Sequence, residues 1–119
     1  GAGGTQRLQR VIGFSNSKYW IYTARKFNAK ECFQYGFFTK LVKKEELIYE
    51  ALILSNQIIK NSPIGVKCAK KAIDFGADSN LKEGLLYERK EYNVAVNTDD
   101  RVEALKAFKH KREAKWSNK

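Results

Sequence analysis

The chain has 119 residues, enough for one modest domain, and it contains no methionine, so we expect a processed product or a fragment of a longer protein. No stretch approaches the roughly 18 consecutive apolar residues of a transmembrane helix, and no basic segment leads into an apolar one at the start, so neither a membrane span nor a signal peptide is visible. The 23 basic residues outnumber the 13 acidic ones and give a net charge of +10, so the surface should attract phosphates on a cofactor, on nucleic acid or on a membrane.

The chain opens with GAGGTQRLQRVIG, in which glycines precede a short amphipathic run. A helix is expected over Thr5–Ile12, because Leu8, Val11 and Ile12 share one helical face and Gly13 can end it. A glycine cluster before a helix usually means that the backbone comes close to something. The cluster does not complete a dinucleotide-binding fingerprint, however, since Gln6 occupies the position of its last glycine.

Two further short helices and a strand are predicted in the first third of the chain. Ser15 or Ser17 can cap a helix that carries aromatic residues. A third helix should run over 29–35 and stop at Gly36. Residues 37–42, FFTKLV, are rich in strand formers and predict one short strand. Aromatic side chains crowd this region, namely Trp20, Tyr22, Phe27, Phe33, Phe37 and Phe38.

The second half of the chain predicts four helices. The first spans 45–60, with an apolar stripe made by Leu47, Ile48, Ala51, Leu52, Ile58 and Ile59. Ser62 and Pro63 are a good N-cap and first residue for the next, which should end near Gly76. Asn80 with Glu83 resembles a capping box that opens a helix to about Val96. Thr98 and Asp99 should cap the last helix, with Val102, Leu105 and Phe108 on its inner face.

Together these elements predict a mainly α fold with at most one short strand. The helical stripes are strong, but each can bury only one side. Burying a large apolar side chain is worth about 1.5–3 kcal/mol. So many apolar and aromatic side chains, with so little sheet, indicate a partner surface that this chain does not itself supply.

The residues that could carry chemistry do not form a complete active site. Glu45 and Glu46, like Asp99 and Asp100, are neighbours on a helix and therefore do not face each other, so we interpret them as helix-start charges. His110 lies in a solvated basic run, and no serine or cysteine stands in a recognised nucleophile motif.

Cysteine and histidine are too few and too scattered to predict a metal site. Cys32 and Cys68 form no CxxC pair, and His110 is the one histidine of the chain. No disulfide can be inferred from two such cysteines, and we expect two small buried thiols in a reducing compartment.

The C-terminal run offers a different kind of candidate. Residues 101–119 hold seven basic residues against two acidic ones. Phe108 and Lys111 are three positions apart, which would place them on one helix face. Such a pair could stack a flat ring and bind a phosphate. It could equally be a core phenylalanine beside a solvated lysine.

Four segments, in this order and spacing, carry a resemblance to a known family. They are GAGGTQRL at 1–8, TARKFNAKECFQYGFFTKLV at 23–42, NSPIGVKCAKKAI at 61–73 and TDDRVEALKAFKHKR at 98–112. Together they closely resemble the C-terminal part of enoyl-CoA hydratases, in the crotonase superfamily. TAR and AFKHKR look most like the branch that includes methylglutaconyl-CoA hydratase, which is also described as binding AU-rich RNA.

The resemblance implies that residues 1–119 are the helical, trimer-forming region of the crotonase α/β spiral fold, without the N-terminal spiral core. Gly1 matches a position whose backbone N–H helps to orient the active-site water, and the family's two catalytic glutamates lie upstream. We therefore expect no catalytic residue in this chain. Gly3 and Gly4 match a tight passage from strand to helix.

The resemblance also assigns a role to the C-terminal pair. Phe108 and Lys111 match positions that touch the adenine and the phosphates of CoA, usually from a neighbouring subunit, and Arg112 could assist. A ring can stack on adenine and an ammonium can meet a phosphate. Two departures from the family are Ala104, where many relatives have glycine, and the pair Phe37–Phe38, where a smaller aliphatic pair is usual.

The leading expectation is a fragment, inactive alone, of a lyase that adds water to the double bond of 2-enoyl-CoA thioesters in fatty acid β-oxidation. It would need no cofactor beyond the CoA of its substrate, and it would form a homotrimer or hexamer, away from membranes. Its place would be the mitochondrial matrix in a eukaryote and the cytoplasm otherwise. The alternatives are an RNA-binding module, an enoyl-CoA isomerase or related superfamily enzyme, and an oligomerisation module without a ligand.

Overall fold

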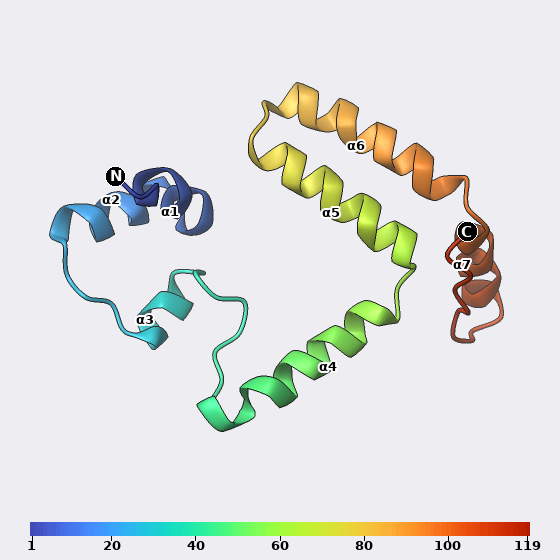
Figure 1. The fold of residues 1–119 in the computed structure, drawn as a ribbon, viewed down its shortest axis with the longest axis horizontal. Coiled ribbons are helices and arrows are strands. Elements are labelled where there is room, and N and C mark those ends of the chain that lie inside the picture. Colours follow the sequence, from blue (N-terminus) through green and yellow to red (C-terminus); the bar gives the residue numbers. More distant parts are fainter. The chain divides into compact units, whose positions relative to one another are not determined.

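The computed structural model describes residues 1–119, which form helices and connecting loops with no strand (Figure 1). The predicted mainly α fold is confirmed. The elements, in chain order, are α1 (Gly4–Ile12), α2 (Phe14–Thr23), α3 (Ala29–Gln34), the 3₁₀ turn η1 (Lys44–Glu46), α4 (Leu47–Ile59), α5 (Pro63–Ala77), α6 (Leu81–Val96) and α7 (Asp99–Lys109). Contacts divide the chain into two compact units, Gly1–Leu47 and Ile48–Lys119, which are described separately.

The strand predicted at 37–42 is wrong. These residues form bends and irregular backbone between α3 and η1. A strand needs a neighbour to satisfy its backbone N–H and C=O groups, and no other segment of the chain forms one. Residues with a high preference for strands therefore do not form a strand here without a second strand to pair with.

In the first unit α1 packs against α2, and Gly13 connects them. Gly13 has φ 83° and ψ 163°, a conformation that is open essentially to glycine alone. The helix begins directly after it, so the predicted caps Ser15 and Ser17 are wrong. Ser17 instead lies buried inside α2, where its hydroxyl donates to the Phe14 carbonyl at 2.8 Å.

Aromatic side chains hold the rest of this unit together. Trp20 stacks on Phe27 with ring centroids 4.1 Å apart, and Tyr35 meets Trp20 edge to face at 5.5 Å. The Arg25 guanidinium lies 3.9 Å from the centre of the Phe27 ring and bonds to Glu31 at 2.8 Å. The buried indole N–H of Trp20 has no hydrogen-bond acceptor. The cluster therefore contacts itself but leaves a polar group unsatisfied.

The second unit is built on the antiparallel pair α5 and α6, which run side by side (Figure 1). Ser62 caps α5 by accepting from the Gly65 N–H at 3.2 Å, and Pro63 is its first residue, as predicted. Asn80 caps α6 by accepting from the Glu83 N–H at 3.0 Å. Phe75 and Tyr87 stack between the two helices at 4.2 Å.

Most of the predicted apolar stripes are exposed. Large parts of Leu47, Ile48, Leu52 and Ile59 face solvent along α4. The predicted inner face of α7 is also wrong for this chain, because Val102, Leu105 and Phe108 are all exposed, whereas Asp100 and Ala107 are buried. The periodicity marked a face that needs a partner, and no element of this unit covers it.

The two cysteines are free thiols, Cys68 buried and Cys32 half-buried. Burial raises the pKa of the Cys68 thiol, and a hydrogen bond with Glu91 adds to the effect, so this thiol stays protonated and inert. None of the helices has the length and apolarity that crossing a bilayer requires.

Candidate functional site

The C-terminal end of α7 turns sharply at Lys111. The helix ends with two backbone bonds, from the Arg112 N–H to the Ala107 carbonyl at 3.1 Å and from the Lys111 N–H to the Phe108 carbonyl at 3.2 Å. This pattern is a Schellman motif, in which the residue after the C-cap adopts a left-handed conformation. Lys111 has φ 51° and occupies that position, where glycine is the usual residue. A side chain there costs about 1–2 kcal/mol relative to glycine.

This turn corrects one sequence prediction. Lys111 lies two residues beyond the end of α7 and does not continue its helical path, so it and Phe108 do not share a helix face. The two residues are nevertheless joined by the bond from the Lys111 N–H to the Phe108 carbonyl. Phe108 is 86% exposed, so in this chain its ring is not part of a core. The end of α7 thus exposes an aromatic ring at Phe108 and, three residues later in the turn, the side chain of Lys111.

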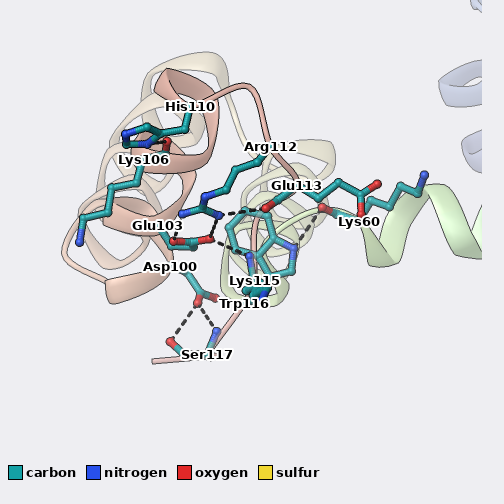
Figure 2. A network of polar contacts seen from close by, with 10 residues as sticks. All are labelled: Lys60, Asp100, Glu103, Lys106, His110, Arg112, Glu113, Lys115, Trp116 and Ser117. Atoms are coloured by element: carbon teal, nitrogen blue, oxygen red, sulfur yellow. Dashed lines mark hydrogen bonds and ion pairs between the residues drawn. The ribbon is translucent and has the colours of Figure 1, made fainter.

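The carboxylate of Glu103 fastens the residues that follow the turn (Figure 2). The Arg112 guanidinium donates to its two oxygens at 2.5 and 3.0 Å, and the Lys115 N–H donates at 2.8 Å. The Arg112 bonds, with help from the Lys115 N–H, lower the pKa of Glu103 to about 2, and Glu103 in turn raises the pKa of Arg112. Both groups are therefore charged at any working pH.

Asp100 fastens the end of the chain in the same way. It has no exposed surface and accepts bonds from the Ser117 N–H at 2.7 Å, the Asn118 N–H at 3.1 Å, and the hydroxyls of Ser117 and Ser62 at 3.1 and 3.2 Å. Burial alone would raise the pKa of Asp100, but these hydrogen bonds outweigh it and the pKa is lowered. The side chain is thus a buried, ionised and well-satisfied acceptor.

A third contact joins the residues after α7 to the residue that follows α4. The Trp116 indole N–H donates to the Lys60 carbonyl at 3.1 Å, just after the end of α4 (Figure 2). We call residues 113–118 the C-terminal strap. It doubles back along α7 and is held at Glu103, Asp100 and Lys60. The corner at Lys111 therefore stands between α7 and a strap that is fixed at several points.

The other residues considered in the sequence analysis are not part of a comparable network of contacts. Gly1 is exposed and open, and Gly3 caps α1 with φ 85°. Glu45 and Glu46 lie in η1, directly before α4. His110 caps α7, with Nδ1 2.8 Å from the Lys106 carbonyl. No group of three or more metal-ligating side chains gathers anywhere in the chain.

Asp100 is the residue whose role the sequence did not reveal. Its position in the sequence predicts a helix-start charge, and it does lie in the first turn of α7. Its main partners, Ser62 and Ser117, are 38 and 17 positions away. No local signal identifies such contacts.

Comparison with known proteins decides the family. The profile of the enoyl-CoA hydratase/isomerase family matches residues 1–119, the whole chain. The chain belongs to this family. The resemblance that the four sequence segments carry is thereby confirmed at the level of the enoyl-CoA hydratase/isomerase family.

Individual members of the enoyl-CoA hydratase/isomerase family agree with this assignment. A protein of Arabidopsis thaliana named probable enoyl-CoA hydratase 2, mitochondrial, is 44% identical over 112 residues, which are 94% of this chain and 37% of that protein. The short-chain-enoyl-CoA hydratase of Clostridium acetobutylicum is 36% identical over 112 residues, again 94% of this chain, and 43% of that protein.

A solved structure shows the same fold. The crystal structure of an enoyl-CoA hydratase from Bacillus anthracis superposes with a TM-score of 0.90 at 40% identity, covering 100% of this chain and 46% of that one. The chain thus spans less than half the length of these relatives, and it corresponds to part of a hydratase-like protein.

Proposed function

We propose that residues 1–119 supply the CoA-binding end of an enzyme that adds water to the double bond of 2-enoyl-CoA thioesters. Phe108 would offer its ring to the adenine, and Lys111 would meet a phosphate. The observation that carries the proposal is the exposed ring of Phe108 in the last turn of α7, followed three residues later by a lysine held in a left-handed conformation. Strain of this kind persists at sites where the surroundings enforce it for a purpose.

Electrostatics favour a phosphate at this corner. The ammonium of Lys111 is exposed, and further cations surround it in sequence, whereas Glu103 is already paired with Arg112. A cation at an exposed corner can form a charge-assisted bond to a phosphate without desolvation of a buried group. Arg112 is occupied by Glu103, so the expected help from Arg112 in phosphate binding is not part of the proposal.

The chemical step would belong to residues outside this chain. The well-placed carboxylates of the site, Glu103 and Asp100, are ionised acceptors whose oxygens already take several hydrogen bonds. Such groups are poor general acids or bases, because their pKa values lie far from the operating pH. Two upstream glutamates would act as acid and base, and the Gly1 backbone would help to orient the water. The same scaffold could also serve an isomerase.

The exposed apolar faces support a proposal about the oligomeric state, and the name of one relative supports a proposal about the location in the cell. The uncovered side chains of α4, α6 and α7 fit a homotrimer or hexamer in which this region packs on a spiral core and on other subunits. The corresponding pathway would be fatty acid β-oxidation. If the source is a eukaryote, the mitochondrial matrix would be its place, as the name of the Arabidopsis relative suggests for that protein.

The test is a substitution in the full-length protein that carries this segment. Lys111→Ala should raise KM for crotonyl-CoA by about five- to thirtyfold with kcat nearly unchanged, because one lost charge-assisted contact is worth roughly 1–2 kcal/mol and lies far from the reacting carbon. Lys109→Ala removes another exposed charge, from the last turn of α7, and should leave KM unchanged. An unchanged KM in Lys111→Ala would refute the assignment. An RNA-binding module would instead lose RNA affinity in both variants.

A further inference from the structure

The left-handed conformation at Lys111 needs support from its neighbours. Two backbone bonds form the turn itself, but they form equally well around glycine, which pays no penalty there. The residue next to Lys111 is Arg112, and both of its terminal nitrogens are held by Glu103, one to two turns back along α7. The backbone of Lys115 is held by the same carboxylate. The corner is therefore bracketed on its C-terminal side by contacts to one side chain.

We infer that the Glu103–Arg112 ion pair is a positioning device that holds the ammonium of Lys111 at the phosphate-binding corner. The inference rests on the proposed function, because it assigns a purpose to the position of Lys111. Glu103 would touch no part of the substrate. It would act through Arg112 and the strap, which fix the direction in which residue 111 leaves the helix.

Three features make this pair suited to the task. An Arg–carboxylate fork fixes orientation as well as distance, which a lysine in place of Arg112 would not do. The pKa of Glu103, at about 2, keeps the fork charged throughout the physiological range. The fork also withdraws Arg112 from the phosphate, so a single cation, Lys111, would define the binding point.

The test compares two thioesters in the full-length protein. Crotonyl-CoA carries the nucleotide, and crotonyl-pantetheine lacks it. Glu103→Gln should raise KM for crotonyl-CoA by about three- to tenfold, since a looser corner loses part of one charged contact. It should leave kcat, and KM for crotonyl-pantetheine, within twofold of the wild type. Glu113→Gln is the matched control, because Glu113 is exposed and its carboxylate has no part in the fork, and it should change neither KM.

A double-mutant cycle separates this inference from the proposed function. If Glu103 acts through Lys111, Glu103→Gln should add almost nothing to KM in a Lys111→Ala background. If Lys111→Ala raises KM for crotonyl-CoA and Glu103→Gln does not, the positioning role is overturned but the proposed function stands. An equal rise of KM for both thioesters, or full additivity, would show a merely structural pair and would also overturn it. No effect of either substitution would overturn the proposed function.

A second measurement does not depend on activity. In the full-length protein, backbone chemical shifts report whether residue 111 is left-handed, and unchanged shifts along the rest of α7 show that the variant is folded. The wild type should show a left-handed Lys111. Arg112→Gln, which removes the fork from the other side, should lower the left-handed population of that residue. A Lys111 that stays fully left-handed in Arg112→Gln would contradict the inference.

Discussion

Arg112 and Glu103 meet as a two-pronged ion pair, with the two terminal guanidinium nitrogens 2.5 and 3.0 Å from the two carboxylate oxygens. The pair closes a loop of nine positions across the end of α7. With Asp100, it fixes the C-terminal strap on the same helix that carries Phe108. The structural and the proposed functional features of the chain therefore meet at one corner.

The pH dependence of stability should reflect this pair. The folded pKa of Glu103 is lowered from 4.5 to about 2, chiefly by Arg112, so the unfolded chain binds a proton first as the pH falls. The stabilisation is then fully present above about pH 5 and is lost progressively towards pH 2. Denaturant unfolding between pH 7 and pH 2 should show this loss, and Glu103→Gln should flatten the curve. An identical curve in the variant would contradict the assignment.

Asp100 should be the main anchor of the strap. Asp100→Ala removes the acceptor for four hydrogen bonds and leaves their donors on Ser62, Ser117 and Asn118 without this partner. The amides of Ser117 and Asn118 should then exchange with solvent at least about tenfold faster, because the strap opens locally without global unfolding. Native-state hydrogen exchange measures this directly. Asp99→Ala, one position away on the exposed surface, should leave these amides protected.

Two substitutions of opposite sign test the backbone of the first unit. Ala24, after α2, has φ 47°, so Ala24→Gly should raise the free energy of unfolding by up to about 1 kcal/mol. Gly13 has a conformation that alanine does not adopt readily, so Gly13→Ala should lower it by at least about 1 kcal/mol. Urea unfolding followed by Trp20 fluorescence, with Trp116 replaced by phenylalanine in all three proteins, reports on this unit. Equal midpoints for all three proteins would show that the first unit does not depend on these turns.

The exposed apolar faces should make the 119-residue chain self-associate. Leu81, Leu85 and Leu86 are all more than half exposed on α6, and α4 adds a second uncovered stripe. Light scattering should show concentration-dependent oligomers, and a dye for apolar surface should bind. Leu85→Glu should weaken both signals. A monodisperse monomer without dye binding would count against an uncovered interface.

The chain alone should not hydrate enoyl-CoA. The two carboxylates that anchor the strap, Glu103 and Asp100, already accept several hydrogen bonds and are poor acids or bases. Loss of crotonyl-CoA absorbance in the presence of the pure 119-residue chain should match the buffer. Clear turnover would place the catalytic residues within residues 1–119.

Local chemistry explains what the sequence could predict. Ser62 with Pro63, and Thr98, cap their helices through bonds within three or four residues, and all were predicted. The sequence predicts Gly13 as a helix end but not as the residue directly before the next helix. Its φ and ψ cannot be inferred from the sequence, which shows only that a glycine is present.

The rest could not be predicted, for two physical reasons. The residue that usually indicates a left-handed helix end is glycine, so a lysine at position 111 does not predict the turn. The partners of Asp100 and Glu103 are brought together only when the strap folds back, which no periodicity encodes. The strand at 37–42 failed for the converse reason, since its side chains suit a sheet that this chain does not provide.

The most direct test of the account is KM for crotonyl-CoA in the Lys111→Gly variant of the full-length protein. Glycine fits the left-handed turn better than lysine, so the variant should be at least as stable as the wild type. If Lys111 is kept at this strained position to bind a phosphate of CoA, KM should rise by about five- to thirtyfold while kcat stays within twofold. A more stable variant with unchanged KM would show that Lys111 has no part in CoA binding.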